Sequence, residues 1–203
     1  MVTRLLIARH GNTFSTGEVP RRVGKNTDLP LVLSGILQAQ RLGHYIKAKG
    51  IVLDEVVVSS LKRTQQTAFE IIKIVDSTLS IRVADRFTEI DYGPDENKRE
   101  EDVRARIGAA ALEAWDKSAM VPPGWRVDAQ KIKKDWLDVG RECQNKTMLV
   151  VTSNGIARFA PCLVGDVERF QQTHTIKIAT GALCVLEKEN DQWLVKEWNK
   201  IPL

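Results

Sequence analysis

The sequence predicts an α/β fold: a three-layer sandwich in which a mostly parallel central sheet carries helices on both faces. Two observations lead to this prediction. Short apolar runs alternate with longer segments whose apolar residues recur at helical spacing. The strongest apolar run, Met148 to Thr152, and the first one both end in a small polar turn. The 203 residues are enough for a sizeable core, and we expect one domain over residues 1–203.

In the first half of the chain, strands and helices alternate regularly. The run from Thr3 to Ala8 stops too close to Gly11 for a helix, which predicts a buried strand. Ser34 is a candidate cap for a helix that continues to about Lys49. The other expected elements of this half are a strand at Glu55 to Val58, a helix from about Leu61 to Val75, and a short strand at Ile81 to Ala84.

The second half contains the segment that fits the alternation least, at about residues 92–130. We expect it to be a helical cap inserted over the carboxyl ends of the strands. It includes a charged helix from about Lys98 to Trp115, in which Glu100 and Arg104 are four residues apart. The elements expected after it are a helix from about Ala129 to Glu142, the strand Met148 to Thr152, a short helix after Asn154, and strands at Ala182 to Glu187 and Gln192 to Trp198.

The composition argues against several classes of protein. With 43% hydrophobic and 28% charged residues, the chain is typical of a soluble globular protein. No apolar run approaches the roughly 20 residues of a membrane span, and the start lacks the pattern of a signal peptide. Cys143, Cys162 and Cys184 show no metal-ligand spacing. We therefore expect a cytoplasmic protein with reduced thiols, no metal site and no membrane partner.

The net charge of +4 raises the question of nucleic-acid binding. Lysines and arginines are interspersed with acidic residues, as in DENKREEDVRAR, and no basic stripe with interleaved aromatic residues is present. We therefore expect no nucleic-acid partner. The mild positive balance suits a small anionic substrate better. Sequence leaves the oligomeric state open.

Polar residues suited to phosphate chemistry follow three of the expected strands. Arg9 and His10 follow the first, Ser59 to Arg63 the second, and Thr152 to Gly155 the central one. Because ligands of open α/β sheets bind at the carboxyl ends of strands, we expect these residues to share one crevice. An arginine guanidinium matches the geometry of phosphate, and an imidazole can act as a nucleophile at phosphorus.

Four segments of the first half resemble one known family. LIARHGNT is similar to the Arg-His-Gly signature of the histidine phosphatase superfamily, the phosphoglycerate-mutase-like group. TDLPLVLSGILQAQ, SSLKRTQQTA and TEIDYG resemble three further segments of that family, in the same order. Val32 replaces a usual Thr, and Ser60 replaces a usual Pro. The Arg-His-Gly tripeptide alone is a weak signal, whereas four ordered segments together are specific.

The resemblance implies hydrolysis of a small phosphorylated substrate, a phosphomonoester, without a metal or organic cofactor. His10 would take the phosphoryl group and become phosphohistidine. Arg9 and Arg63 would hold the phosphoryl oxygens, and Asn12 would donate a side-chain N–H to one of them. Glu89 would act as the general acid that protonates the leaving oxygen. A mutase is less favoured, because the chain is short and shows no clear added elements for binding a sugar acid.

The resemblance fails at one position of the central strand end. The family has Ser-His-Gly-Gly there, and its His is a second phosphate ligand. This chain has Ser153 in place of the His and Asn154 in place of a Gly. A hydroxyl carries no positive charge, and loss of one such donor typically costs about 10²–10³ in rate. Ser153 and Asn154 remain candidate phosphate-binding residues at a helix N-terminus.

Two alternatives therefore remain open. The chain is either a working phosphatase or a catalytically weak or inactive pseudo-phosphatase that binds a phosphorylated ligand or protein partner. Ser153 is equally well explained as a simple helix cap. We expect Trp115, Trp125 and Trp136 to pack the cap onto the sheet, with a substrate pocket as the alternative place for Trp125.

Overall fold

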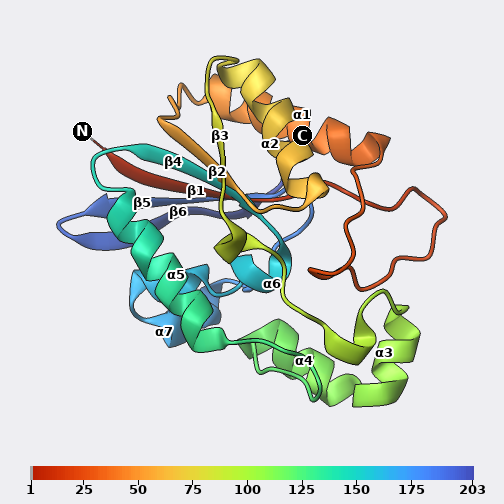
Figure 1. Cartoon of the computed structure of the whole chain (residues 1–203). Helices are drawn as coiled ribbons and strands as arrows, with labels where there is room; N and C mark the ends of the chain where they lie inside the picture. Colours follow the sequence, from red (N-terminus) through yellow and green to blue (C-terminus); the bar gives the residue numbers. More distant parts are fainter. Residues whose placement is uncertain (1) are drawn as a thin grey trace.

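A six-stranded sheet forms the centre of the molecule in the computed structural model, which describes residues 2–203 (Figure 1). The strand order is β3-β2-β4-β1-β5-β6. The strands are β1 (Thr3–Arg9), β2 (Glu55–Val58), β3 (Ile81–Val83), β4 (Thr147–Thr152), β5 (Leu183–Glu189) and β6 (Gln192–Lys200). The strands β1 to β4 run parallel to one another, whereas β5 pairs antiparallel with β1 and with β6. The sheet is thus mixed, and the predicted α/β sandwich is confirmed.

Helices cover both faces of this sheet (Figure 1). On one face lie α1 (Leu33–Ala48) and α2 (Lys62–Val75), and on the other lie α5 (Ala129–Glu142), α6 (Asn154–Ala157) and α7 (Val167–Thr173). The strand period of two divides the core, because Leu5 and Ile7 of β1 face one helical layer and Leu6 and Ala8 face the other. β4 is buried along its whole length, as expected for a central parallel strand.

The structure differs from the sequence prediction in two helices. Ser34 does not cap α1: Val32 holds the N-cap position, and Ser34 lies inside the first turn. The expected helix from Lys98 to Trp115 is two helices, α3 (Glu100–Ile107) and α4 (Ala109–Ser118). They are separated by Gly108, whose φ of 84° lies in the region that glycine tolerates best.

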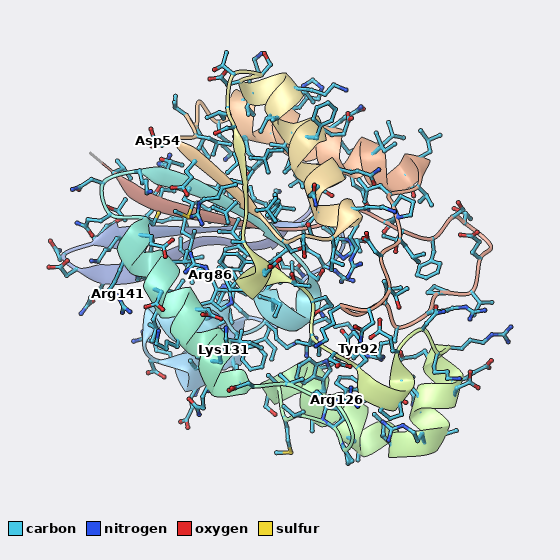
Figure 2. All side chains as sticks on the ribbon, in the orientation of Figure 1. Asp54, Arg86, Tyr92, Arg126, Lys131 and Arg141 are labelled. Atoms are coloured by element: carbon cyan, nitrogen blue, oxygen red, sulfur yellow. The ribbon has the colours of Figure 1, made fainter. Side chains whose placement is uncertain are left out.

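Residues 92–130 contain α3 and α4 and lie beside the long loop that follows β1 (Figure 1). Trp115 and Trp125 pack edge to face with ring centroids 5.2 Å apart, and Trp125 packs on Tyr92 at 4.7 Å. Figure 2 shows Tyr92 and Arg126 near the junction of this segment with the rest of the molecule. The backbone N–H of Arg126 donates to the carbonyl of Asp91 there (2.9 Å). Trp115 also packs on Phe159 outside the cap (6.1 Å), so Trp115 and Trp125 join the cap to the rest of the molecule as predicted, whereas Trp136 lies on α5 and packs on Phe87 (5.2 Å).

None of the helices in residues 2–203 combines the length and the apolarity that a membrane span requires.

Candidate active site

A cavity of about 1120 Å³ opens at the carboxyl ends of β1 and β4, beside α3 and α4. Five of the predicted site residues line it: Arg9, His10, Asn12, Glu89 and Asn154. The other two, Arg63 and Ser153, are fully buried and lie outside the lining. The structure thus brings the strand-end residues of β1 and β4 together. Arg63 of α2 is buried behind them, and its charge lowers the pKa of His10.

His10 lies directly after β1. Its backbone N–H donates to the carbonyl of Thr152 (3.0 Å), which continues the β1–β4 ladder by one residue. Its Nδ1 lies 2.7 Å from the carbonyl of Gly11. Because a carbonyl only accepts, Nδ1 carries the proton and Nε2 presents a lone pair. Burial, and then the charges of Arg63 and Arg9, lower the pKa of His10 well below its ordinary range, so the ring is neutral at neutral pH.

The loop after His10 lies against the first turn of α1. A Cβ on Gly11 would lie 2.3 Å from the carbonyl oxygen of Gly35, so no larger residue fits without moving backbone. The backbone N–H of Asn12 donates to Oε1 of Gln38 (2.8 Å), and the Thr180 hydroxyl donates to Oδ1 of Asn12 (2.6 Å). Gln38 therefore holds the loop that directly follows His10.

Both arginines keep one buried N–H group without an acceptor. Arg9 donates from Nη1 to the carbonyl of Ile178 (2.6 Å), and Arg63 donates to the carbonyls of Thr27 (2.9 Å) and Gly24 (3.2 Å). The Nε atoms of both side chains are buried and have no hydrogen-bond partner among residues 2–203. Burial lowers the pKa of each guanidinium. An unpaired buried donor is costly, so an oxyanion within reach would be bound favourably.

Glu89 is buried on the cavity wall, where three groups donate to it. Its Oε1 accepts from the backbone N–H of Ile90 (2.8 Å), and its Oε2 accepts from Gly155 N–H (3.2 Å) and from the Tyr92 hydroxyl (3.4 Å). Burial raises the pKa of Tyr92, so the phenol keeps its proton and donates. A Cβ on Gly155 would lie 2.2 Å from Oε1 of Glu89, so the carboxylate reaches this turn only because residue 155 is a glycine.

Ser153 and Asn154 have different environments at the end of β4. Ser153 holds the N-cap position of α6, as the helix-cap interpretation expects, but its buried hydroxyl makes no capping bond and has no hydrogen-bond partner among residues 2–203. Asn154 accepts from the backbone N–H of Ile178 through Oδ1 (2.8 Å). The carbonyl of Ile178 in turn accepts from Arg9, so Asn154 supports the residue that holds this guanidinium.

The expected anion site at the helix N-terminus is weaker than predicted. α6 is a single turn, and the N–H of Gly155 donates to Glu89, so this N–H is not free for a ligand. A helix this short sums few peptide dipoles. The donors left for a phosphate at this end of β4 are the side chains of Ser153 and Asn154 and the backbone N–H of Asn154.

Sequence reasoning missed Arg158 and Lys177, which also line the cavity. Arg158 is buried, donates from Nε to the Asn154 carbonyl (3.3 Å), and stacks over Trp115 with 4.0 Å between its Cζ and the ring centroid. Its spacing of one helical turn after Asn154 was the available signal. Lys177 pairs with Asp116 (2.7 Å), and no local pattern connects these two residues.

The remaining histidines lie elsewhere. His44 is exposed on α1, and His174 stacks on Phe170 with ring centroids 4.9 Å apart. Neither lines the cavity. Trp125 does not line it either, and its Nε1 donates to Asp95 (2.6 Å) within the cap. Within residues 2–203, no group of three or more His, Cys, Asp or Glu side chains is placed to hold a metal ion.

The sequence model of the histidine phosphatase superfamily (branch 1) matches residues 5–201, and the chain therefore belongs to this superfamily. The family predicted from the four sequence segments is confirmed. A 2,3-bisphosphoglycerate-dependent phosphoglycerate mutase of Methylobacterium sp. (strain 4-46) is 34% identical over 120 residues. These residues are 59% of this chain and 57% of the mutase, so the match spans just over half of that relative.

Solved structures share the fold at low sequence identity. The structure named Mycobacterial hydrolase 1 is 18% identical, with a TM-score of 0.81, and the alignment covers 99% of this chain and 100% of the hydrolase. The alpha-ribazole phosphatase from Shigella flexneri is 20% identical, with a TM-score of 0.76 and 98% of each chain covered. At these identities the likeness establishes the common fold.

Proposed function

We propose that this chain is a phosphomonoester hydrolase that passes a phosphoryl group through His10. The observation that carries the proposal is the buried imidazole of His10 beside two buried guanidinium groups. Burial lowers the pKa of His10, and the charges of Arg63 and Arg9 lower it further, so the ring is neutral. Each of these arginines has a buried Nε that finds no acceptor in the described part of the chain. Such a pocket offers a nucleophile together with fixed positive charge, which are the two requirements of phosphoryl transfer. Membership of the histidine phosphatase superfamily supports the same reaction class.

In the proposed reaction, Nε2 of His10 attacks phosphorus and the bond from phosphorus to the leaving oxygen breaks. Glu89 enters this step in its protonated form and gives its proton to that oxygen as the charge develops, which leaves a carboxylate for the second step. Arg9 and Arg63, with N–H or O–H groups of Asn12, Ser153 and Asn154, stabilise the phosphoryl oxygens. Water then attacks phosphorus, the bond to Nε2 breaks, and Glu89 takes the proton of the water. Phosphate leaves, and His10 is neutral again.

The cavity lining favours a small substrate with an anionic leaving group. Seven lysines and arginines line it against four acidic residues. Phe14 and Leu112 add apolar surface beside the charged side chains. Because α3 and α4 contribute Arg104, Lys117 and their neighbours to the outer part, we propose that the cap selects the leaving group.

A trapped intermediate tests the function directly. Acid-free denaturing quench during turnover of a ³²P-labelled aryl phosphate should yield protein carrying a phosphate that is labile in acid and stable in base. Peptide mapping should place it on His10. Label that survives acid would indicate a serine or threonine ester instead, and turnover without any label would contradict a covalent intermediate.

A second candidate function is favoured by the end of β4. The buried hydroxyl of Ser153 stands where the resemblance implies a charged histidine, so the pocket has one cation fewer. The alternative is a weak or inactive pseudo-phosphatase that binds a phosphorylated ligand or protein. Measurable binding of phosphate or vanadate, with hydrolysis of p-nitrophenyl phosphate no faster than the uncatalysed reaction, would favour this alternative.

Replacing Ser153 by Ala should separate stability from ligand binding. The variant loses a buried hydroxyl that has no partner within residues 2–203, so its free energy of unfolding should be unchanged or higher by up to about 1 kcal/mol. Its affinity for phosphate should fall, because the hydroxyl is the proposed donor. Urea unfolding with and without phosphate measures both quantities.

Thr152→Val is the matched control for this substitution. Thr152 is the adjacent buried hydroxyl, and it donates to the carbonyl of Phe87 (2.7 Å). Its loss leaves that carbonyl unpaired and should lower stability by about 1–3 kcal/mol with little effect on phosphate affinity. A Ser153→Ala variant that is destabilised as strongly as Thr152→Val would contradict the interpretation of Ser153.

A further inference from the structure

A turn at residues 24–27 is held from two sides. The backbone N–H of Thr27 donates to the carbonyl of Gly24 (3.5 Å) and closes the turn. From one side, Arg63 donates to the carbonyls of both residues, at 3.2 Å and 2.9 Å. From the other side, Oε1 of Glu96 accepts from the Gly24 backbone N–H (2.9 Å) and from the Thr27 hydroxyl (2.6 Å). The same two residues thus connect the carboxylate of Glu96 to the guanidinium of Arg63.

We propose that Glu96 is a positioning residue for Arg63, acting through the turn at 24–27. This inference rests on the proposed function, in which Arg63 stabilises the phosphoryl oxygens. The two carbonyls of the turn are the hydrogen-bond acceptors of the Arg63 side chain in the part of the chain that the structure describes. Lys25 at the middle of the turn also donates its backbone N–H to the carbonyl of Ile90 (3.1 Å) and pairs with Asp91 (3.4 Å). Glu96 differs from these contacts because it holds Gly24 and Thr27 themselves, the two residues whose carbonyls accept from Arg63.

The packing around Gly24 supports this coupling. A Cβ on Gly24 would lie 2.1 Å from Oε2 of Glu96 and 2.8 Å from the carbonyl oxygen of Ile90. The carboxylate therefore approaches the turn as closely as a glycine allows. Hydrogen bonds to a carboxylate are stronger than bonds to a neutral acceptor, so one side chain suffices to hold both residues of the turn.

Glu96 lies in the cap segment, whereas Arg63 lies on α2 in the body of the molecule. The hydrogen bonds through the turn at 24–27 therefore connect the cap to the body of the molecule. A displacement of about 1 Å at a reacting group costs up to roughly 10²-fold in rate, so small movements of this turn would be felt in turnover.

A double-mutant cycle tests the proposal. Glu96→Ala should lower kcat for p-nitrophenyl phosphate by roughly 10- to 100-fold with a smaller change in KM. In a protein that already carries Arg63→Ala, the same change should lower kcat by less than about threefold, because the residue it positions is gone. Glu96→Gln should restore most of the activity, since its amide oxygen can accept both bonds.

Asp95→Ala is the matched control. Asp95 is the neighbouring acid of the cap and binds Arg106 and Trp125, with no contact to the turn at 24–27. The factor by which Asp95→Ala changes kcat should be the same with and without Arg63→Ala, so the two factors should multiply in the double variant. Independent effects of Glu96→Ala and Arg63→Ala would overturn the proposal. If Glu96→Ala does not fold, Thr27→Val serves instead, because it removes the hydroxyl bond to Glu96 and keeps the carbonyl that receives Arg63.

A crystal structure of the Glu96 variant, or of Thr27→Val, decides the positioning independently of activity. The guanidinium of Arg63 should leave at least one of its two carbonyl acceptors. An unmoved guanidinium and turn would overturn the inference. If Arg63→Ala alone leaves turnover intact, the proposed catalytic role of Arg63 fails, and this crystal structure still decides whether Glu96 positions it.

Discussion

Replacing His10 by Asn is expected to lower turnover of phosphomonoesters by at least roughly 10³-fold, because the variant has no nucleophile for phosphorus. Asparagine keeps an N–H that can donate to the carbonyl of Gly11, so the loop should remain in place. Arg9 and Arg63 are unchanged, and vanadate affinity should therefore fall far less than kcat. Phosphate release and equilibrium vanadate binding measure the two quantities.

His44→Asn is the matched control, because His44 is exposed on α1 and does not line the cavity. The pH dependence of the wild type supplies a second readout. Only the unprotonated ring attacks phosphorus, and the pKa of His10 is lowered by burial and by Arg63 and Arg9. The value of kcat/KM should therefore show no loss due to His10 as the pH falls from 8 to about 6.5. Undiminished turnover in His10→Asn would exclude this nucleophile.

Glu89→Gln should slow hydrolysis of alkyl phosphates by roughly 10²–10⁴-fold, because an alkoxide leaves slowly without a proton. The loss should be much smaller for p-nitrophenyl phosphate, whose phenolate leaves readily. The amide oxygen of glutamine can take the place of Oε1 or Oε2 and so keeps the backbone bond from Ile90 or the one from Gly155, and the side chain has the same size as Glu89. Measuring kcat over a series of esters that differ in leaving-group pKa gives the comparison.

Asp91→Asn is a suitable control for this experiment. Asp91 is a buried acid next to the site, where it pairs with Lys25 (3.4 Å) and Arg126 (3.2 Å). Its loss should lower the free energy of unfolding. Any change in kcat should be the same factor for every ester, whatever its leaving group. An equal loss for all esters in Glu89→Gln would show that Glu89 only supports the turn at Gly155 and does not donate a proton.

Most of the fold follows from patterns that sequence contains. The β4 run is continuously apolar because it is covered on both faces, and its length is too short for a helix. The break between α3 and α4 was not predictable in the same way. A single glycine inside a helical pattern is often tolerated, and only the tertiary structure places Gly108 at a positive φ.

The candidate site was also predictable only in part. Arg9, His10 and Asn154 were found because the topology of parallel strands brings their ends together. Contacts between distant segments were missed, because no local period encodes them. Lys177 and Asp116 are 61 residues apart in the chain, and Thr27 and Glu96 are 69 apart. These contacts depend on how the cap and the loops pack.

The backbone of Ile178 couples Asn154 at the end of β4 to Arg9 at the end of β1. Its N–H donates to Asn154, and its carbonyl accepts from Arg9. Asn154→Gly would remove the side chain that holds the Ile178 backbone, and with it a support of the Arg9 guanidinium. A histidine at Ser153 would also have to enter a fully buried position. A change at both positions would therefore disturb two things at once, the packing around a buried side chain and the hydrogen bonds that hold the Arg9 guanidinium.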